Sequence, residues 1–266
     1  MTFITHFKKI LADQIIILLI LSLFCFLFEF LFAWLFFESD FKKIMASFIL
    51  RMPPGLTAFL GVQGGITSFF IQMLAFGYTH PVILICLAFF PISIPARYIS
   101  GEVELSTFDL LLTKPVNRLV VPLAIFTFLG LALTLLASAM VLGTLAGNLY
   151  FDLNVKMIDY AKASITGIFF FLSMGAVSIA IASFQSEKAK AAGKAISLMV
   201  LLYFFDTLVK LSTTLTHLSG YSYFQLYQPG KLVMKQADMS SSILISLTLT
   251  LVFLGTGLFR FCRRDL

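Results

Sequence analysis

Two acidic side chains interrupt long runs of apolar residues, and they are the first candidates for chemistry in this sequence. Glu29 lies among phenylalanines, and Asp206 is followed four residues later by Lys210. An ionisable group inside a membrane is costly unless it is paired or hydrated, so each carboxyl is a candidate for a substrate path. The alternatives are structural: Glu29 can hydrogen-bond to a neighbouring helix, and Asp206 can form an i, i+4 ion pair with Lys210.

Residue patterns for catalysis or metal binding are not found elsewhere in the chain. An intramembrane protease requires a Ser/His pair, two aspartates on facing spans or an H-E-x-x-H motif, and the sequence has none of them. His80 and His217 are isolated, so no metal site is expected. The cysteines Cys25, Cys86 and Cys262 form no C-x-x-C pair. The nucleotide-binding motif G-x-x-x-x-G-K-[ST] is also lacking, so the chain is not predicted to be an enzyme.

A short polar segment between two apolar runs, residues 99–118, reads ISGEVELSTFDLLLTKPVNR. Its apolar face follows the helical spacing i, i+3 and i+7 and consists of Leu105, Phe108 and Leu112. Glu102 and Glu104 suit the N-terminal end of a helix because of the helix dipole, and Pro115 ends the helix. The pattern predicts a short amphipathic helix along the membrane surface. Such a helix can rest on lipid head groups or bind a partner.

The composition excludes a water-soluble fold. Of the 266 residues, 59% are apolar and 12% are charged, with a mean hydropathy of +0.99. Soluble domains have about 25% charged residues. The charges cluster between long apolar runs, so the net charge of +6 reflects membrane topology and not a nucleic-acid surface. The sequence predicts a single-domain, all-α integral membrane protein.

Apolar runs of about 20 residues, long enough to cross roughly 30 Å of hydrocarbon, predict six transmembrane helices. Their approximate bounds are 14–37, 79–99, 119–147, 163–184, 195–215 and 241–259. Residues 1–13 predict an amphipathic helix on the membrane surface, as residues 100–118 do. The uncharged stretch 56–77 contains glycines and glutamines, which favour an interfacial or re-entrant segment over a seventh span. Small residues in the third span predict close helix packing; they are Gly130, Gly143 and Gly147.

An even number of spans leaves both termini on one side of the membrane. Lys and Arg are about twice as dense in the segments on that side as in those on the other, which indicates cytoplasmic termini. The first span is too long for the core of a signal peptide, and no small-residue cleavage site follows it. The lack of an organellar targeting segment and the Lys- and Phe-rich composition favour the inner membrane of a bacterium.

Residues 101–118 resemble the loop after the second span of the ABC-2 type permeases, which commonly reads G-E-x-E-x-G-T-L-[DE]-L-L-L-x-x-P-V-S-R. The matching positions are Gly101, Glu102, Glu104, Thr107, Asp109, Leu110, Leu111, Leu112, Pro115, Val116 and Arg118. Three positions depart from the pattern: Ser106, Phe108 and Asn117. His80-Pro81, Tyr227-Gln228-Pro229 and the ending at residues 263–266 extend the resemblance over the chain. The pattern is most similar to the six-span permeases of the nitrous-oxide-reductase maturation transporter type.

The resemblance implies a type V exporter-like transmembrane domain that forms a homodimer. It also implies a separate cytoplasmic ATPase that docks on each subunit and binds the ATP and Mg²⁺, so this chain itself has no cofactor. The residues implied in that contact are Gly101, Glu102, Glu104, Thr107, Phe108, Asp109, Leu112, Pro115 and Arg118. The implied function is export of a substrate or movement of membrane lipid. The alternative is mechanotransmission, in which ATP hydrolysis drives an extracytoplasmic accessory protein without transport.

Overall fold

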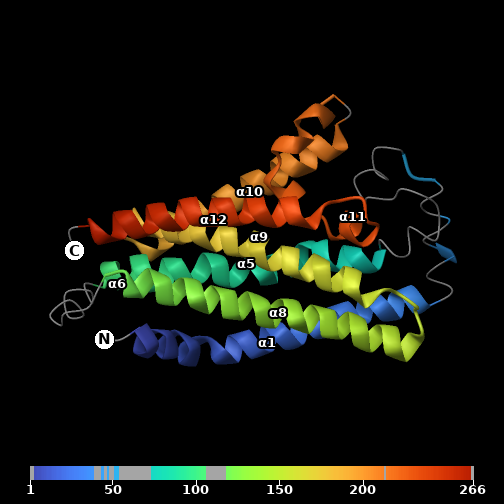
Figure 1. The fold of residues 1–266 in the computed structure, drawn as a ribbon, viewed down its shortest axis with the longest axis horizontal. Helices are drawn as coiled ribbons and strands as arrows, with labels where there is room; N and C mark the ends of the chain where they lie inside the picture. Colours follow the sequence, from blue (N-terminus) through green and yellow to red (C-terminus); the bar gives the residue numbers. More distant parts are fainter. Residues whose placement is uncertain are drawn as a thin grey trace.

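The computed structural model describes residues 3–38, 43–44, 47, 51–53, 73–105, 118–212 and 214–264. This described part contains six helices that are long and apolar enough to cross a membrane, and it contains no strand. The helices form an elongated bundle (Figure 1). The prediction of an all-α fold with six spans is therefore confirmed. Most of the predicted interfacial stretch 56–77 lies outside the described residues.

The spanning helices run along the bundle. They are α1 (Phe3–Phe37), the segment Met73–Glu104 containing α5 (Pro81–Pro95), α8 (Val120–Phe151), α9 (Met157–Ser183), α10 (Lys188–Leu211) and α12 (Met239–Cys262). Shorter elements connect them: η1 (Gly77–Thr79), η2 (Ala96–Ser100), α6 (Gly101–Glu104), η3 (Thr216–Tyr221), η4 (Tyr223–Leu226) and α11 (Pro229–Val233). In the structure α1 is one helix through both the predicted surface segment 1–13 and the predicted span 14–37. Both termini and α6 lie at the same end of the bundle, which we call the terminal end (Figure 1).

Proline positions shape the second span. Pro81 occupies the start of α5, where its missing N–H is not needed, and the His80 side chain accepts a hydrogen bond from the Val82 amide at 3.3 Å. Pro91 and Pro95 lie inside the helix and remove two backbone donors. The turn that follows, η2, is a π-helix, a form that accommodates such a disruption. Through η2 the chain continues into α6 at the terminal end.

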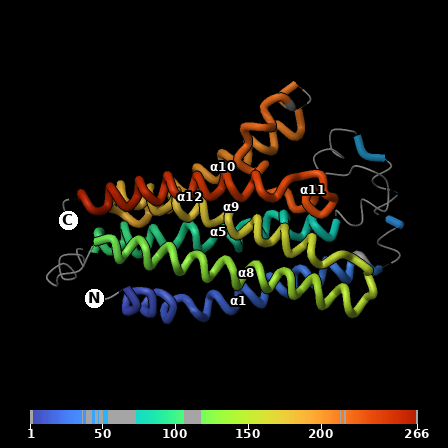
Figure 2. Tube along the Cα trace, viewed as in Figure 1, coloured from blue at the N-terminus to red at the C-terminus, as the bar shows by residue number. Residues whose placement is uncertain are grey.

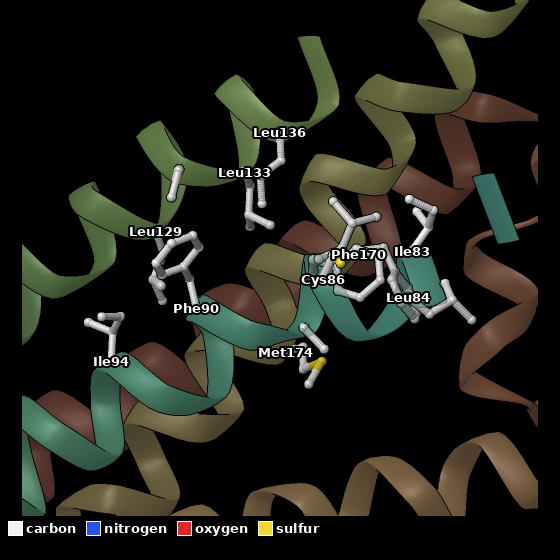
Figure 3. Close-up of a cluster of buried hydrophobic side chains, with 14 of the residues drawn as sticks. Ile83, Leu84, Cys86, Phe90, Ile94, Leu129, Leu133, Leu136, Phe170 and Met174 are labelled. Carbon is white, nitrogen blue, oxygen red and sulfur yellow. The ribbon is translucent and has the colours of Figure 1, made fainter. Parts of the chain in front are cut away.

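The hydrophobic core lies between α5, α8 and α9 (Figure 3). Side chains from the three helices interlock there, including Ile83, Leu84, Phe90, Ile94, Leu129, Leu133, Leu136, Phe170 and Met174. Phe90 on α5 meets Phe128 on α8 edge to face, with ring centroids 5.7 Å apart. Lipid tails are as apolar as these side chains, so close van der Waals contact, and not exclusion from water, holds the helices together.

Small residues allow α1 to approach α8 closely. A Cβ atom placed on Gly143 would lie 2.3 Å from the carbonyl oxygen of Phe26, and one on Gly147 would lie 2.1 Å from the Cβ of Ala33. The predicted packing role of these two glycines is confirmed. Around Gly130, by contrast, no atom of the described residues lies within 4 Å of such a Cβ.

The fifth span takes a different course from the others. From the terminal end, α10 diverges from α12 along its length, as the tube in Figure 2 shows. Three short helical segments, η3, η4 and α11, return the chain to α12. Asp238 caps α12 by accepting hydrogen bonds from the amides of Ser240 and Ser241 at 3.2 and 3.0 Å. These bonds stabilise the ionised carboxylate and hold the pKa of Asp238 below its usual value.

Candidate functional site

The predicted partner-binding segment, residues 100–118, begins and ends at the terminal end of the bundle (Figure 1). Its described candidate residues are Gly101, Glu102, Glu104 and Arg118. The other candidates fall outside the described residues: Thr107, Phe108, Asp109, Leu112 and Pro115. Leu105, the last described residue before them, exposes 73% of its surface. An apolar side chain is therefore presented at the terminal end.

Glu104 connects α6 to the first turn of α10. Its Oε2 accepts a hydrogen bond from the backbone amide of Lys188 at 2.8 Å. Glu187, the N-cap residue of α10, makes no side-chain capping bond within the described structure. Glu104 therefore supplies, from a distant segment, the acceptor that the start of a helix needs. Its negative charge is also favourable beside the positive end of the helix dipole.

Glu102 connects α6 to α1. Its Oε1 lies 3.8 Å from Lys9 Nζ, and the Glu102 side chain is only 18% exposed. One turn further along α1, Asp13 accepts a hydrogen bond from Tyr98 Oη at 2.7 Å. An ion pair with an exposed partner contributes only about 0–1 kcal/mol. The two contacts therefore matter chiefly because they fix the positions of η2 and α6 against α1.

Two arginines cap helix ends at the same place. The Arg264 guanidinium donates to the carbonyl oxygens of Ser183 and Gln185 at 3.3 and 2.9 Å, at the end of α9. Arg118 donates to the carbonyl oxygens of Arg264 and Cys262 at 2.6 and 3.3 Å, at the end of α12. Ser183 and Cys262 are the last residues of their helices, and Gln185 and Arg264 follow them, so the arginines bind carbonyls at both C-termini and stabilise them. Burial, with the charge of Arg260, lowers the pKa of Arg264.

The contacts at the terminal end join the predicted partner-binding segment to most of the bundle. Ser100 adds a hydrogen bond to the carbonyl oxygen of Ala182 on α9 at 3.0 Å. Residues 100–104 are thus bonded to α1, α9 and α10, and Arg118, at the other end of the segment, is bonded to the end of α12. The described ends of this segment are therefore connected to several spans at once. The connections to Lys9, Lys188 and Arg264 could not be read from the sequence because they depend on helix packing.

Glu29 lies in a closed interior position. It is 0% exposed, and neither carboxyl oxygen has a hydrogen-bond partner among the described residues. Two glycines make room for it: a Cβ on Gly77 would lie 2.6 Å from Glu29 Oε2, and one on Gly143 would lie 3.1 Å from the Glu29 Cβ. Their chain neighbours Tyr78 and Thr144 hydrogen-bond to each other at 2.8 Å. The expected hydrogen bond from Glu29 to a neighbouring helix is not found among the described residues.

Asp206, the second intramembrane carboxyl, is fully paired within the chain. Its Oδ2 lies 2.6 Å from Lys210 Nζ, so the predicted i, i+4 ion pair is present. Ser222 donates a hydrogen bond to its other oxygen, which ties α10 to the turn before η4. Outside the span, burial and the charge of Lys210 lower the pKa of Lys231, while Asp206 opposes that shift. This arrangement holds the end of α10 against the segment that leads to α12.

The six apolar helices indicate a multi-pass membrane protein, and comparison with known proteins identifies a family of membrane transport proteins. The family described as ABC-2 family transporter protein matches residues 5–266. The chain therefore belongs to the ABC-2 family, whose members form the membrane permease of an ABC transporter and not its ATPase. A search of the curated proteins found no match.

Proposed function

We propose that the chain is the permease subunit of an ATP-driven exporter, energised by a separate ATPase that docks on residues 100–118. The ATPase binds ATP and Mg²⁺, and two permease copies form the membrane domain. We also propose the bacterial inner membrane as its location, with both termini cytoplasmic. The resemblance of the loop sequences supports the nitrous-oxide-reductase maturation type. The proposed activity is export of a substrate or movement of a membrane lipid.

The observation that carries this proposal is the set of bonds around α6. Glu104 is bonded to the start of α10, and Glu102 is paired with Lys9 on α1. An ATPase that closes on ATP can move a permease only through an element that is stiffly connected to the spans. The exposed Leu105 offers a docked partner an apolar contact surface, and the bonds beside it connect that surface to the spans.

Several spans have exposed apolar faces, and we expect those of α1 and α10 to be used in the pairing of two copies. On α1 the face includes Ile16, Leu19, Ile20, Leu23 and Leu27. On α10 it includes Val200, Leu201, Phe204 and Leu208. We expect cysteines introduced on these faces to form crosslinks between copies in the membrane.

Mechanotransmission is the second candidate, and the two carboxyls favour it. Glu29 is 0% exposed and Asp206 is ion-paired within the chain, so neither lines an open path in this conformation. A structure of the complex without nucleotide and with ATP separates the two functions. A cavity that opens outward or to lipid supports export, whereas a shift of residues 101–105 with no cavity supports mechanotransmission. The absence of any shift contradicts both.

Association with the ATPase tests the docking site directly. We expect Leu105→Asp to abolish co-purification of an ABC ATPase with the permease, because a charge replaces exposed apolar surface. Glu104→Gln should retain association but weaken the stimulation of ATP hydrolysis, since the neutral amide caps α10 less well. Glu187→Gln is the matched control, because it removes an exposed carboxylate from the same end. Unchanged association in Leu105→Asp would overturn the docking site.

A further inference from the structure

An apolar groove of about 420 Å³ lies between α9, α10 and α12. Its lining includes Ile181 on α9, Ala195, Leu198 and Met199 on α10, and Leu249 and Phe253 on α12. The volume is within the range of roughly 300–1,000 Å³ that is usual for small-molecule sites. Two of the helices that line it, α10 and α12, diverge from each other along α10 (Figures 1 and 2).

The groove is open to its surroundings, and its lining extends to Phe184, which follows α9 at the terminal end. Two of its lining residues are exposed: Phe184 by 54% and Leu198 by 38%. Water molecules are not bound stably in such a site, because an apolar cavity lacks the polar groups with which water forms hydrogen bonds. An empty groove would leave its walls without van der Waals partners. Hydrocarbon chains of the surrounding lipid are therefore the fitting occupant.

Basic side chains converge at the mouth of the groove. The Arg260 guanidinium lies over the ring of Phe184, 5.3 Å from its centroid. Beside the lining residues Phe184 and Ala195, Lys194 Nζ donates to Gln185 Oε1 at 3.0 Å. The nearby carboxylate of Glu187 pairs with Lys190 instead. The mouth therefore has an excess of positive charge.

We propose that the groove binds one acyl chain of an anionic phospholipid, whose phosphate is held by Arg260 and Lys194. The apolar lining accounts for the chain, and the two cations account for the head group. Arg and Lys at a helix end extend toward the interface, where they meet lipid phosphates. The lipid is a bound component of the fold, and the inference does not depend on the proposed export function.

A second copy of the chain fits the groove less well than a lipid does. The α10 residues in the groove are spaced at i, i+3, i+4 and i+7, and they face α9 and α12 of the same chain; they are Ala195, Leu198, Met199 and Leu202. Val200, Leu201 and Phe204 lie on other faces of α10 and are exposed. The surface available to a second copy is thus separate from the groove.

Native mass spectrometry of the purified full-length protein with palmitoyl-oleoyl phosphatidylglycerol tests the proposal. We expect one molecule of this lipid to stay bound. The Lys194→Ala/Arg260→Ala variant should bind it about 25-fold more weakly, at about fivefold for each cation lost. Lys8→Ala removes an exposed cation from α1 and is the matched control. Ala195→Phe fills the groove and should reduce retention of the lipid without changing the oligomeric state.

Four results would overturn the proposal, the second and third of them with the same meaning. The first is equal retention of phosphatidylglycerol by the wild type and the double variant, which are both expected to fold because the two cations are exposed. The second is equal retention of phosphatidylcholine and phosphatidylglycerol by the wild type. The third is stabilisation of the wild type by inorganic phosphate alone. Either of these two results would mean that no anionic lipid is recognised. The fourth is loss of the dimer in Ala195→Phe with lipid retention unchanged, which would make a second copy the occupant.

Discussion

Replacing Gly77 with alanine tests how tightly Glu29 is enclosed. The new Cβ would lie 2.6 Å from Oε2, 3.0 Å from Oε1 and 3.1 Å from Cδ of Glu29. The carboxyl has little space to withdraw, because Glu29 is 0% exposed and α8 approaches its Cβ closely at Gly143. Overpacking of this kind costs about 1–3 kcal/mol. At roughly 2–4 °C per kcal/mol for a chain of this size, the Tm should fall by several degrees.

The measurement is thermal unfolding in detergent, followed with a thiol-reactive dye. Cys25 and Cys86 are free and buried, so their labelling reports loss of the core. In a Glu29→Ala background, Gly77→Ala should destabilise the protein by at least about 1 kcal/mol less than it does in the wild type, because the clashing carboxyl is gone. Gly193→Ala, where the added Cβ meets no described atom within 4 Å, should be neutral or slightly stabilising. Equal destabilisation by Gly77→Ala with and without Glu29 would refute the enclosure.

Three further predictions concern ion pairs and caps. Asp206→Asn should lower the Tm more than Asp206→Asn/Lys210→Met does, because the single change leaves a cation without its partner; the reverse order in thermal unfolding would contradict this. Arg264→Ala should cost about 1–3 kcal/mol in the same assay, since it leaves the last carbonyls of α9 unbonded, and Arg263→Ala is the control. The pKa of Asp238 is lower in the folded state than in the unfolded state. The stabilisation by this carboxylate is therefore fully present at pH values above the usual carboxyl pKa, and it is lost as the pH falls through the folded-state pKa. The difference in Tm between the wild type and Asp238→Ala should therefore shrink on acidification, and a constant difference would exclude this cap.

The number and type of spans could be predicted from the sequence for a local reason. Each helix that crosses a bilayer must satisfy its own backbone hydrogen bonds over a continuous apolar run, so the signal lies within one segment. The Asp206–Lys210 pair is local in the same sense, because residues four apart meet on one face of any helix. Gly143 and Gly147 followed from the preference for small residues where helices touch, but the same preference also pointed to Gly130, which meets no neighbour among the described residues.

Only the tertiary structure decided which of the polar residues meet. Glu102 reaches Lys9 on α1, and Glu104 reaches the amide of Lys188 on α10, although each partner is more than 80 residues away. The expected hydrogen bond of Glu29 is not found among the described residues for the same reason, since Gly77 and Gly143 from two other segments enclose its side chain. Residue types and spacing define the faces of single helices. Which faces meet, and at what depth, follows from close packing of all the helices together, which no single segment encodes.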